Sequence, residues 1–247
     1  MKAIILAAGY GARMYPLTLD KPKSLLCVAG KSVLNYLIEN LEKVSEIDKI
    51  YIVVNQKFHA QFAQWLNGEK FTKQIILVND KTTSEETKLG AIGDLCFCLE
   101  TENISTDILV VAGDNIFTFM LADLVKFFND KKNTLVATHI VPYDKICKYS
   151  STEINNDALI LSFEEKPKAP KSNIAGLPLY IFAKENISLI AELRNNKLDA
   201  LGNIIAYLHK KVPVYAFPVK GKRYDIGDLE SYELADLELR KAPQIAS

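Results

Sequence analysis

Short apolar runs alternate with helix-forming segments through the first 140 residues, and this alternation restricts the fold more than any other feature of the chain. Five runs have the length of a buried strand, at residues 2–8, 49–55, 75–79, 107–114 and 134–141. Segments with apolar side chains at helical spacing lie between them, at 33–44, 58–66, 90–99 and 122–130. Repeated β-α units of this kind predict a parallel sheet with helices on both faces.

The second half of the chain has a less regular pattern. We expect strands at 158–166, 177–182 and 212–219, and helices near 185–194, 199–210 and 229–240. No linker, low-complexity tract or internal repeat separates these segments from the first half. The sequence therefore predicts an α/β fold that is Rossmann-like, with a mostly parallel sheet flanked by helices and a mixed C-terminal extension of that sheet. Residues 1–247 are expected to form a single domain.

The overall charge excludes some classes of partner. The chain carries 30 basic and 30 acidic side chains in 247 residues, so its formal net charge at pH 7 is zero. Such a chain has no overall field to draw it to nucleic acid or to a membrane surface. Its four cysteines lack the spacing of a disulfide framework or a zinc site, and no apolar stretch is long enough to cross a bilayer. We therefore expect a cytoplasmic protein with neither nucleic-acid nor membrane partners.

The segment after the first predicted strand, LAAGYGARMYPLTLDKPKSLL, combines glycines with cations. Gly9 and Gly11 lack a Cβ atom, so their backbone N–H groups can approach a phosphate chain closely. Arg13 offers a forked guanidinium and Lys23 a point charge. Met14 stands where the dinucleotide pattern G-x-G-x-x-G requires a third glycine, and the P-loop pattern is absent. The segment predicts a loop that wraps a polyphosphate and belongs to neither of these two types.

The full string G-Y-G-A-R-M-Y-P-L-T, followed by K-P-K, resembles the signature of the sugar-1-phosphate nucleotidyltransferases, which are also called nucleotide-sugar pyrophosphorylases. The resemblance implies that a nucleoside triphosphate is bound by Ala8, Gly9, Gly11, Arg13 and Lys23. Arg13 would contact mainly the pyrophosphate that leaves, and Lys23 the phosphates near the reacting centre. Both are therefore candidate catalytic residues.

Two acidic motifs are candidates for a metal site. Asp114 ends a predicted strand in the string V-A-G-D-N, and Asp225 lies in K-R-Y-D-I-G-D. Considered alone, each aspartate is as easily a turn or cap residue. The resemblance implies that both bind Mg²⁺, with phosphate oxygens and water as further ligands. It also implies that Asn115 contacts the substrate.

The string S-F-E-E-K-P-K-A-P-K-S-N contains the candidate sugar-phosphate residues. Considered alone, it is a solvated loop of mixed charge that prolines interrupt. The resemblance implies that Glu165 contacts sugar hydroxyls and that Lys166 holds the sugar phosphate, as a third candidate catalytic residue. The segment that contacts the base in this family departs here from its commoner patterns, and we expect Gly90 to correspond to the family's glycine.

The resemblance implies that a sugar 1-phosphate attacks the α-phosphorus of a nucleoside triphosphate and that pyrophosphate leaves. The attacking oxygen is already anionic and needs no general base, which agrees with the absence of histidine from all these motifs. The strings A-G-D-N-I-F and E-E-K-P-K-A-P-K-S-N favour glucose 1-phosphate and dTTP, as in the thymidylyltransferase branch. Two alternatives stay open: a cytidylyltransferase acting on a non-sugar phosphate such as phosphocholine, and a non-catalytic nucleotide-sugar sensor of the same fold.

Overall fold

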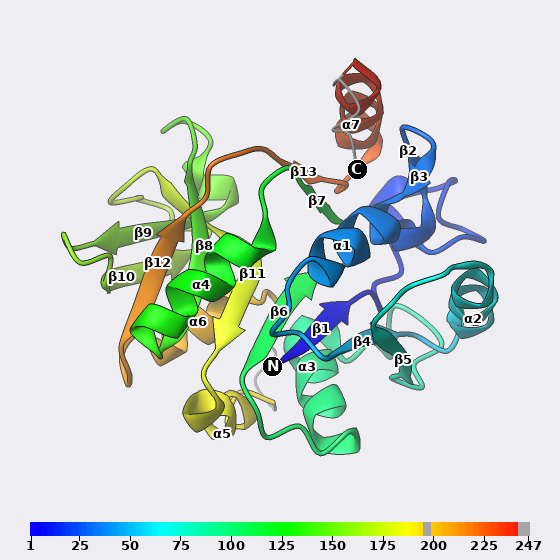
Figure 1. Ribbon diagram of the computed structural model, residues 1–247. Coiled ribbons are helices and arrows are strands. Elements are labelled where there is room, and N and C mark those ends of the chain that lie inside the picture. Colours follow the sequence, from blue (N-terminus) through cyan, green and yellow to red (C-terminus); the bar gives the residue numbers. More distant parts are fainter. Residues whose placement is uncertain (195–198, 242–247) are drawn as a thin grey trace.

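A seven-stranded sheet forms the centre of the computed structural model, which describes residues 1–194 and 199–241 (Figure 1). The strands lie in the order β12-β8-β11-β6-β1-β4-β5. Their bounds are β1 (Lys2–Leu6), β4 (Lys49–Val54), β5 (Gln74–Asn79), β6 (Ile108–Ala112), β8 (Thr134–Ile140), β11 (Ile174–Phe182) and β12 (Val214–Pro218). Neighbouring strands are parallel except where β11 pairs with β6 and with β8. The expected α/β fold with a mostly parallel sheet is therefore confirmed.

Strand β1 lies inside the sheet, and this position explains its unbroken apolar sequence. It pairs in parallel with β4 on one side and with β6 on the other. Helices cover both faces, so Ala3, Ile4 and Ile5 are fully buried. At its carboxyl end, the Leu6 carbonyl oxygen accepts a hydrogen bond from Gly113 N at 2.8 Å. The loop after β1 and the turn after β6 are therefore held side by side.

Helices cover the two faces of the sheet in groups of three (Figure 1). One face carries α1 (Val33–Glu42), α2 (His59–Gly68) and α4 (Leu121–Lys131). The other face carries α3 (Gly90–Thr101), α5 (Ile187–Ala191) and α6 (Gly202–Leu208). The helix expected near 185–194 is thus shorter than predicted. Short 3₁₀ turns lie at η1 (Ala12–Met14), η2 (Lys23–Leu25), η3 (Ile146–Lys148) and η4 (Lys184–Asn186).

One predicted strand of the second half does not join the central sheet. β10 (Ile160–Glu165) pairs antiparallel with β9 (Ser150–Ile154) in a separate two-stranded sheet. Among the described residues, a single bridge from Leu159 to Tyr215 links this segment to the central sheet. The expectation that 158–166 extends the central sheet is therefore wrong. An apolar run of strand length does not reveal which partner it pairs with, because register depends on the faces that packing buries.

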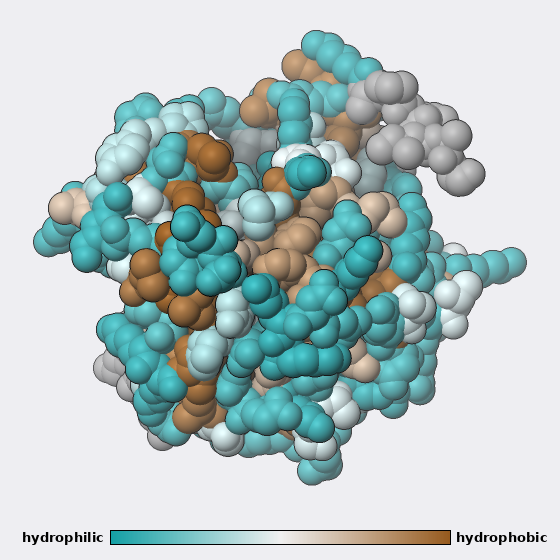
Figure 2. All heavy atoms as spheres, turned by 60° about the vertical axis from the view of Figure 1, so that its left-hand side comes forward, coloured by the Kyte–Doolittle hydropathy of each residue, from teal (hydrophilic) through white to brown (hydrophobic). Residues whose placement is uncertain are grey.

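The side of the molecule formed by β9 and β10 exposes some of its apolar side chains. Figure 2 brings this side forward and shows hydrophobic side chains among hydrophilic ones. Leu161 on β10 is 60% exposed and Ile140 at the end of β8 is 75% exposed. None of the helices in the described ranges has the length and apolar character needed to span a membrane.

Two short antiparallel pairs lie outside these sheets, and one of them carries predicted site residues. β7 (Asn115–Phe117) pairs with β13 (Arg223–Asp225), and β2 (Cys27–Val28) pairs with β3 (Lys31–Ser32). The chain then enters α7 (Leu229–Lys241), which contributes to a buried cluster with Met14, Leu26, Val28, Val33, Ile116, Ile226 and Ala235. In this cluster Ile226, next to Asp225, packs together with Met14 of the glycine loop. The last predicted motif of the sequence is therefore held against the first.

Candidate active site

The glycine loop after β1 is anchored on its inner side and open on its outer side. Gly11 has a φ of 68°, in the left-handed region that favours glycine, and its carbonyl oxygen accepts a hydrogen bond from Thr18 Oγ1 at 2.7 Å. A Cβ atom on Gly11 would lie 3.2 Å from the Thr18 side chain. The η1 turn then leaves Arg13 exposed, while Met14 beside it is fully buried.

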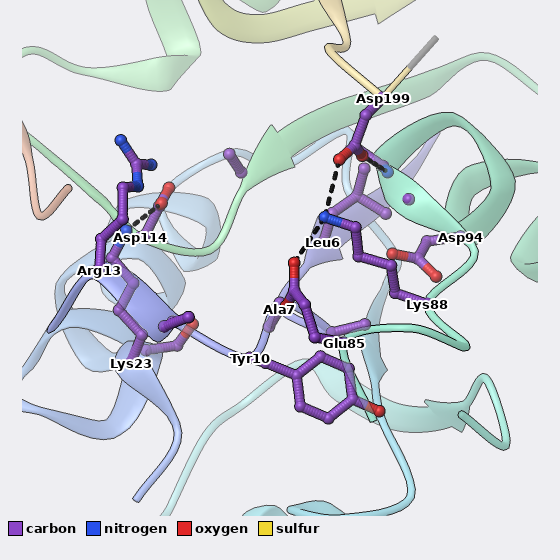
Figure 3. Close-up of a pocket in the computed structure, with 18 of the residues that line it drawn as sticks. Leu6, Ala7, Tyr10, Arg13, Lys23, Glu85, Lys88, Asp94, Asp114 and Asp199 are labelled. Atoms are coloured by element: carbon purple, nitrogen blue, oxygen red, sulfur yellow. Dashed lines mark hydrogen bonds and ion pairs between the residues drawn. The ribbon is translucent and has the colours of Figure 1, made fainter. Parts of the chain in front are cut away.

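A cavity of about 350 Å³ lies at the carboxyl ends of β1 and β6 (Figure 3). Its lining includes seven residues predicted from the sequence, namely Ala8, Gly9, Gly11, Arg13, Lys23, Gly90 and Asp114. Four further charged residues of the lining were not predicted: Glu85, Lys88, Asp94 and Asp199. A cavity in this position is where ligands bind in open α/β sheets.

Lys23 and Asp114 form an ion pair in the wall of this cavity, with Lys23 Nζ 2.7 Å from Asp114 Oδ2. Burial alone would favour the neutral carboxyl, but the charges of Lys23 and Arg223 outweigh it and hold the pKa of Asp114 below its usual range. Asn115, which is fully buried, donates a hydrogen bond to Asp114 Oδ1 at 2.6 Å. Asp114 is therefore ionised at neutral pH, and two side chains fix its orientation.

Asp225 lies beside Asp114 because β13 pairs with β7. Ile226 N donates a hydrogen bond to the Asp114 carbonyl oxygen at 2.9 Å, and the Asp225 side chain is 46% exposed. Two adjacent carboxylates supply the hard oxygen ligands that Mg²⁺ prefers, and they suit this ion if substrate oxygens and water complete its coordination. Within the described residues, no group of three or more histidine, cysteine or acidic side chains is placed to hold a metal ion without such help.

Glu165 and Lys166 do not contribute to the lining of this cavity. Lys166 is exposed, has a φ of 49°, and its backbone N–H donates to the Tyr149 carbonyl oxygen at 2.8 Å. Glu165 packs against the start of α6, where a Cβ atom on Gly202 would overlap its Oε2. Burial raises the pKa of Glu165. Gly202 follows Leu201, which lines the cavity, so the Glu165 carboxyl packs next to the segment that forms part of the cavity wall.

Arg223 is a site residue that the motifs did not identify. Its Nε donates to Asn115 Oδ1, and its Nη2 lies 2.7 Å from Asp225 Oδ2. The side chain is only 8% exposed. Arg223 precedes Asp225 by two residues on one strand, so both side chains lie on the same face of β13. This spacing is the signal that could have identified the arginine.

The model of the nucleotidyl transferase family matches residues 2–242 of the chain. The protein therefore belongs to this family, and the resemblance inferred from its motifs is confirmed. The match extends from the glycine loop through the segment that contains Asp225.

Curated relatives include proteins with several different names. A Sulfolobus acidocaldarius protein provisionally named mannose-1-phosphate guanyltransferase is 33% identical over 97% of this chain and 63% of its own length. The bifunctional protein GlmU of Methanococcus aeolicus is 29% identical over 92% of this chain and 51% of its own length. The UTP–glucose-1-phosphate uridylyltransferase AglF of Haloferax volcanii is 26% identical over 98% of this chain and 97% of its own length. The chain thus spans less than two thirds of the first two relatives and nearly all of the third.

Solved structures share the fold over almost the whole chain. A Bacillus anthracis structure provisionally named glucose-1-phosphate thymidylyltransferase, in complex with a sucrose, has a TM-score of 0.83 at 24% identity and covers 100% of this chain and 98% of its own. A UDP-glucose pyrophosphorylase complexed with UDP-glucose has a TM-score of 0.82 at 20% identity and covers 98% of this chain and 99% of its own. These similarities support the fold described above.

Proposed function

We propose that this chain is a sugar-phosphate nucleotidyltransferase that joins a sugar 1-phosphate to the nucleotidyl group of a nucleoside triphosphate and releases pyrophosphate. The cavity is the observation that supports this best, because it gathers the glycine loop, Arg13, Lys23 and Asp114 around one volume at the sheet edge. Two of the relatives are named for transfers of this type.

On the nucleotide side, the proposed role of each side chain follows from its charge. The Arg13 guanidinium binds two oxygens of the triphosphate, chiefly on the pyrophosphate that leaves. Lys23 turns from Asp114 to the phosphates near the α-phosphorus. Asp114 and Asp225 would hold Mg²⁺, which would neutralise phosphate charge. Arg223 keeps the Asp225 carboxylate oriented toward Asp114.

The sugar 1-phosphate enters on the side of β10. Glu165 receives its hydroxyls, and the exposed Lys166 holds its phosphate against the repulsion of the triphosphate. The motif strings favour glucose 1-phosphate as the sugar. They favour dTTP as the nucleotide, but none of them includes the four charged wall residues that the cavity adds, so the base is considered separately below.

The two alternative functions gain no support from the site. A nucleotide-sugar sensor would not need its catalytic charges, yet Arg13, Lys23 and Asp114 all line the cavity and Asp225 lies beside it. A phosphocholine site requires several aromatic rings around the quaternary ammonium. Tyr10 is the one aromatic side chain among the described residues that line the nucleotide cavity, and phosphocholine in the assay below tests the acceptor side.

Pyrophosphate release tests the proposed function directly. The full chain with Mg²⁺ is assayed with GTP, dTTP, UTP, CTP and ATP, each paired with several sugar 1-phosphates and with phosphocholine. At least one sugar 1-phosphate pair should release pyrophosphate. Asp114→Asn should lower the rate by at least about 10²-fold, because it removes a carboxylate ligand of the Mg²⁺ that would neutralise charge at the reacting phosphates.

Asp144→Asn is the matched control, since Asp144 is an exposed aspartate outside the cavity, and it should leave the rate unchanged. Release with phosphocholine alone would favour the first alternative. Absence of release from every pair would contradict the proposed function, and a normal rate in Asp114→Asn would contradict the metal assignment.

A further inference from the structure

The two ends of the cavity carry opposite charge (Figure 3). At one end, Arg13 and Lys23 accompany Asp114. At the other end, acidic side chains surround the single ammonium of Lys88. A bound triphosphate is drawn to the cationic end by its own charge, so the base of the nucleotide reaches the acidic end. This placement, and the inference that follows, rest on the proposed function.

A bridge of two carboxylates and one ammonium crosses the acidic end. Lys88 Nζ lies 2.7 Å from Glu85 Oε1 and 3.1 Å from Asp199 Oδ2, and these pairs raise the pKa of Lys88. Asp199 Oδ1 also accepts a hydrogen bond from Ala91 N at 3.1 Å, at the start of α3. Glu85 has no other side-chain partner in the described part of the chain. Glu85 is therefore the carboxylate of the bridge that a ligand can engage.

We propose that Glu85 and Lys88 recognise the base and that this base is guanine. Along one edge guanine presents the acceptor O6, then the donors N1–H and N2–H₂. The two oxygens of a carboxylate accept from two adjacent donors in parallel. An ammonium next to that carboxylate donates to O6. The Glu85–Lys88 contact provides this order of groups within one ion pair.

The other bases fit this pair less well. Thymine and uracil present one donor, N3–H, between two carbonyl oxygens, so one carboxylate oxygen would face another acceptor. Adenine and cytosine present one amino group beside a ring acceptor, so one carboxylate oxygen would have no donor. A site built to hydrogen-bond one edge discriminates strongly against edges that leave its polar groups unpaired. The wall therefore favours GTP over the dTTP that the motif strings indicate.

A buried carboxyl next to this bridge adds a further hydrogen-bonding group to the same end of the cavity. Asp94 lines the cavity and is only 6% exposed. Its carboxyl shares a hydrogen bond with Asp80, and no N–H group or hydroxyl of the described residues donates to its Oδ1. Buried polar atoms in folded proteins are normally paired. The guanine amino group has two N–H donors, and Glu85 accepts from one of them. The other N–H is available to donate to Asp94.

Equilibrium binding tests base choice separately from turnover. Calorimetry with the full chain and Mg²⁺ should show GTP binding at least about tenfold more tightly than dTTP, UTP, CTP or ATP. Glu85→Gln replaces one acceptor oxygen with a donor amide, so its affinity for GTP should fall about tenfold, with no loss for dTTP or UTP. Glu86→Gln is the matched control, because Glu86 is exposed and outside the lining. It should leave all five affinities unchanged.

The inference is overturned if the wild type binds another nucleotide most tightly, if Glu85→Gln binds GTP as tightly as the wild type, or if Glu86→Gln loses as much affinity. Selective GTP binding without pyrophosphate release would support the base assignment and contradict the proposed function. Pyrophosphate release that prefers dTTP in both the wild type and Glu85→Gln would do the reverse.

Discussion

At the scale of single residues, two aspartates of the same cavity have opposite electrostatic environments. Asp114 is paired with Lys23, which keeps its pKa below the usual range despite burial. Burial and the neighbouring carboxylate of Asp80 raise the pKa of Asp94 to about 8. One end of the cavity thus holds an ionised carboxylate, and the other end holds a neutral carboxyl at pH 7.

Asp94→Asn should stabilise the protein increasingly as the pH rises from 5 to 8. In this interval the unfolded chain has released the Asp94 proton while the folded wild type retains it, so the free energy of unfolding of the wild type falls with pH. Asparagine keeps the side-chain shape but does not ionise, so it removes this pH-dependent contribution to the free energy of unfolding. The free energy of unfolding of Asp94→Asn minus that of the wild type should be roughly 2–4 kcal/mol larger at pH 8 than at pH 5. Urea unfolding at both values measures it.

Asp144→Asn controls for the loss of an aspartate at an exposed position and should show no such change between pH 5 and pH 8. A stability difference between Asp94→Asn and the wild type that is the same at both pH values would show that Asp94 ionises normally in the folded chain.

At the scale of elements, β10 and α6 meet through a glycine. Gly202 is buried at the start of α6, and it leaves space for the Glu165 carboxyl and for the Phe163 ring. The absence of a Cβ atom allows the two-stranded sheet of β9 and β10 to close onto the helix. Glu165 is thereby fixed at the start of α6, next to Gly202, and the preceding residue Leu201 lines the cavity.

Gly202→Ala should therefore impair the use of the sugar phosphate more than that of the nucleotide. The added methyl overlaps Glu165 Oε2, so the carboxyl must move away from its position at the start of α6. We expect the KM for the sugar 1-phosphate to rise about tenfold, while the KM for the nucleotide stays unchanged. Steady-state kinetics with each substrate varied in turn measures the two constants.

Gly68→Ala, at the last position of α2, is the control, because a Cβ atom there meets no other atom within 4 Å. Its two KM values should equal those of the wild type. An equal rise of both KM values in Gly202→Ala would show that Glu165 supports the structure of the cavity in general and has no specific role in binding the sugar.

At the scale of the whole molecule, the two ends of the chain complete one site. β13 pairs with β7, and the residue after it, Ile226, is fully buried in the cluster that contains Met14 of the glycine loop. α7 closes this cluster from outside with Ala235. The position of Asp225 beside Asp114 thus depends on apolar contacts made by the C-terminal and N-terminal segments together.

Ile226→Ala should lower the free energy of unfolding by about 2–4 kcal/mol, because it leaves a cavity in a fully buried cluster. Leu234→Ala, at a residue of α7 that is 52% exposed, should change the free energy of unfolding by less than about 0.5 kcal/mol. Guanidinium unfolding of both variants measures the difference. Equal effects of the two substitutions would show that α7 and its connection to β13 do not stabilise the folded chain.

The sequence by itself determined most of the strands and helices and seven of the residues that line the cavity. The buried strands of the parallel sheet are unbroken apolar runs, and the helices repeat apolar residues at helical spacing, so neighbouring residues suffice to identify both. The glycine loop, Arg13 and Lys23 lie within one short segment after a strand, and the turn after β6 supplies Asp114. Each of these features depends on residues that are close in the sequence, so a local sequence pattern is enough to predict it.

The tertiary structure alone decided which distant residues meet. Arg223 and Asn115 are 108 residues apart, as are Asp199 and Ala91, and no periodicity in the chain links either pair. The departure of β10 from the central sheet is equally invisible in its apolar run. Glu85 and Lys88 lie in a polar loop whose sequence carries no motif, and the fold places them at the end of the cavity opposite Arg13. Strand pairing and side-chain packing across the whole chain select these contacts, because only the complete core determines which faces are buried and which registers are compatible.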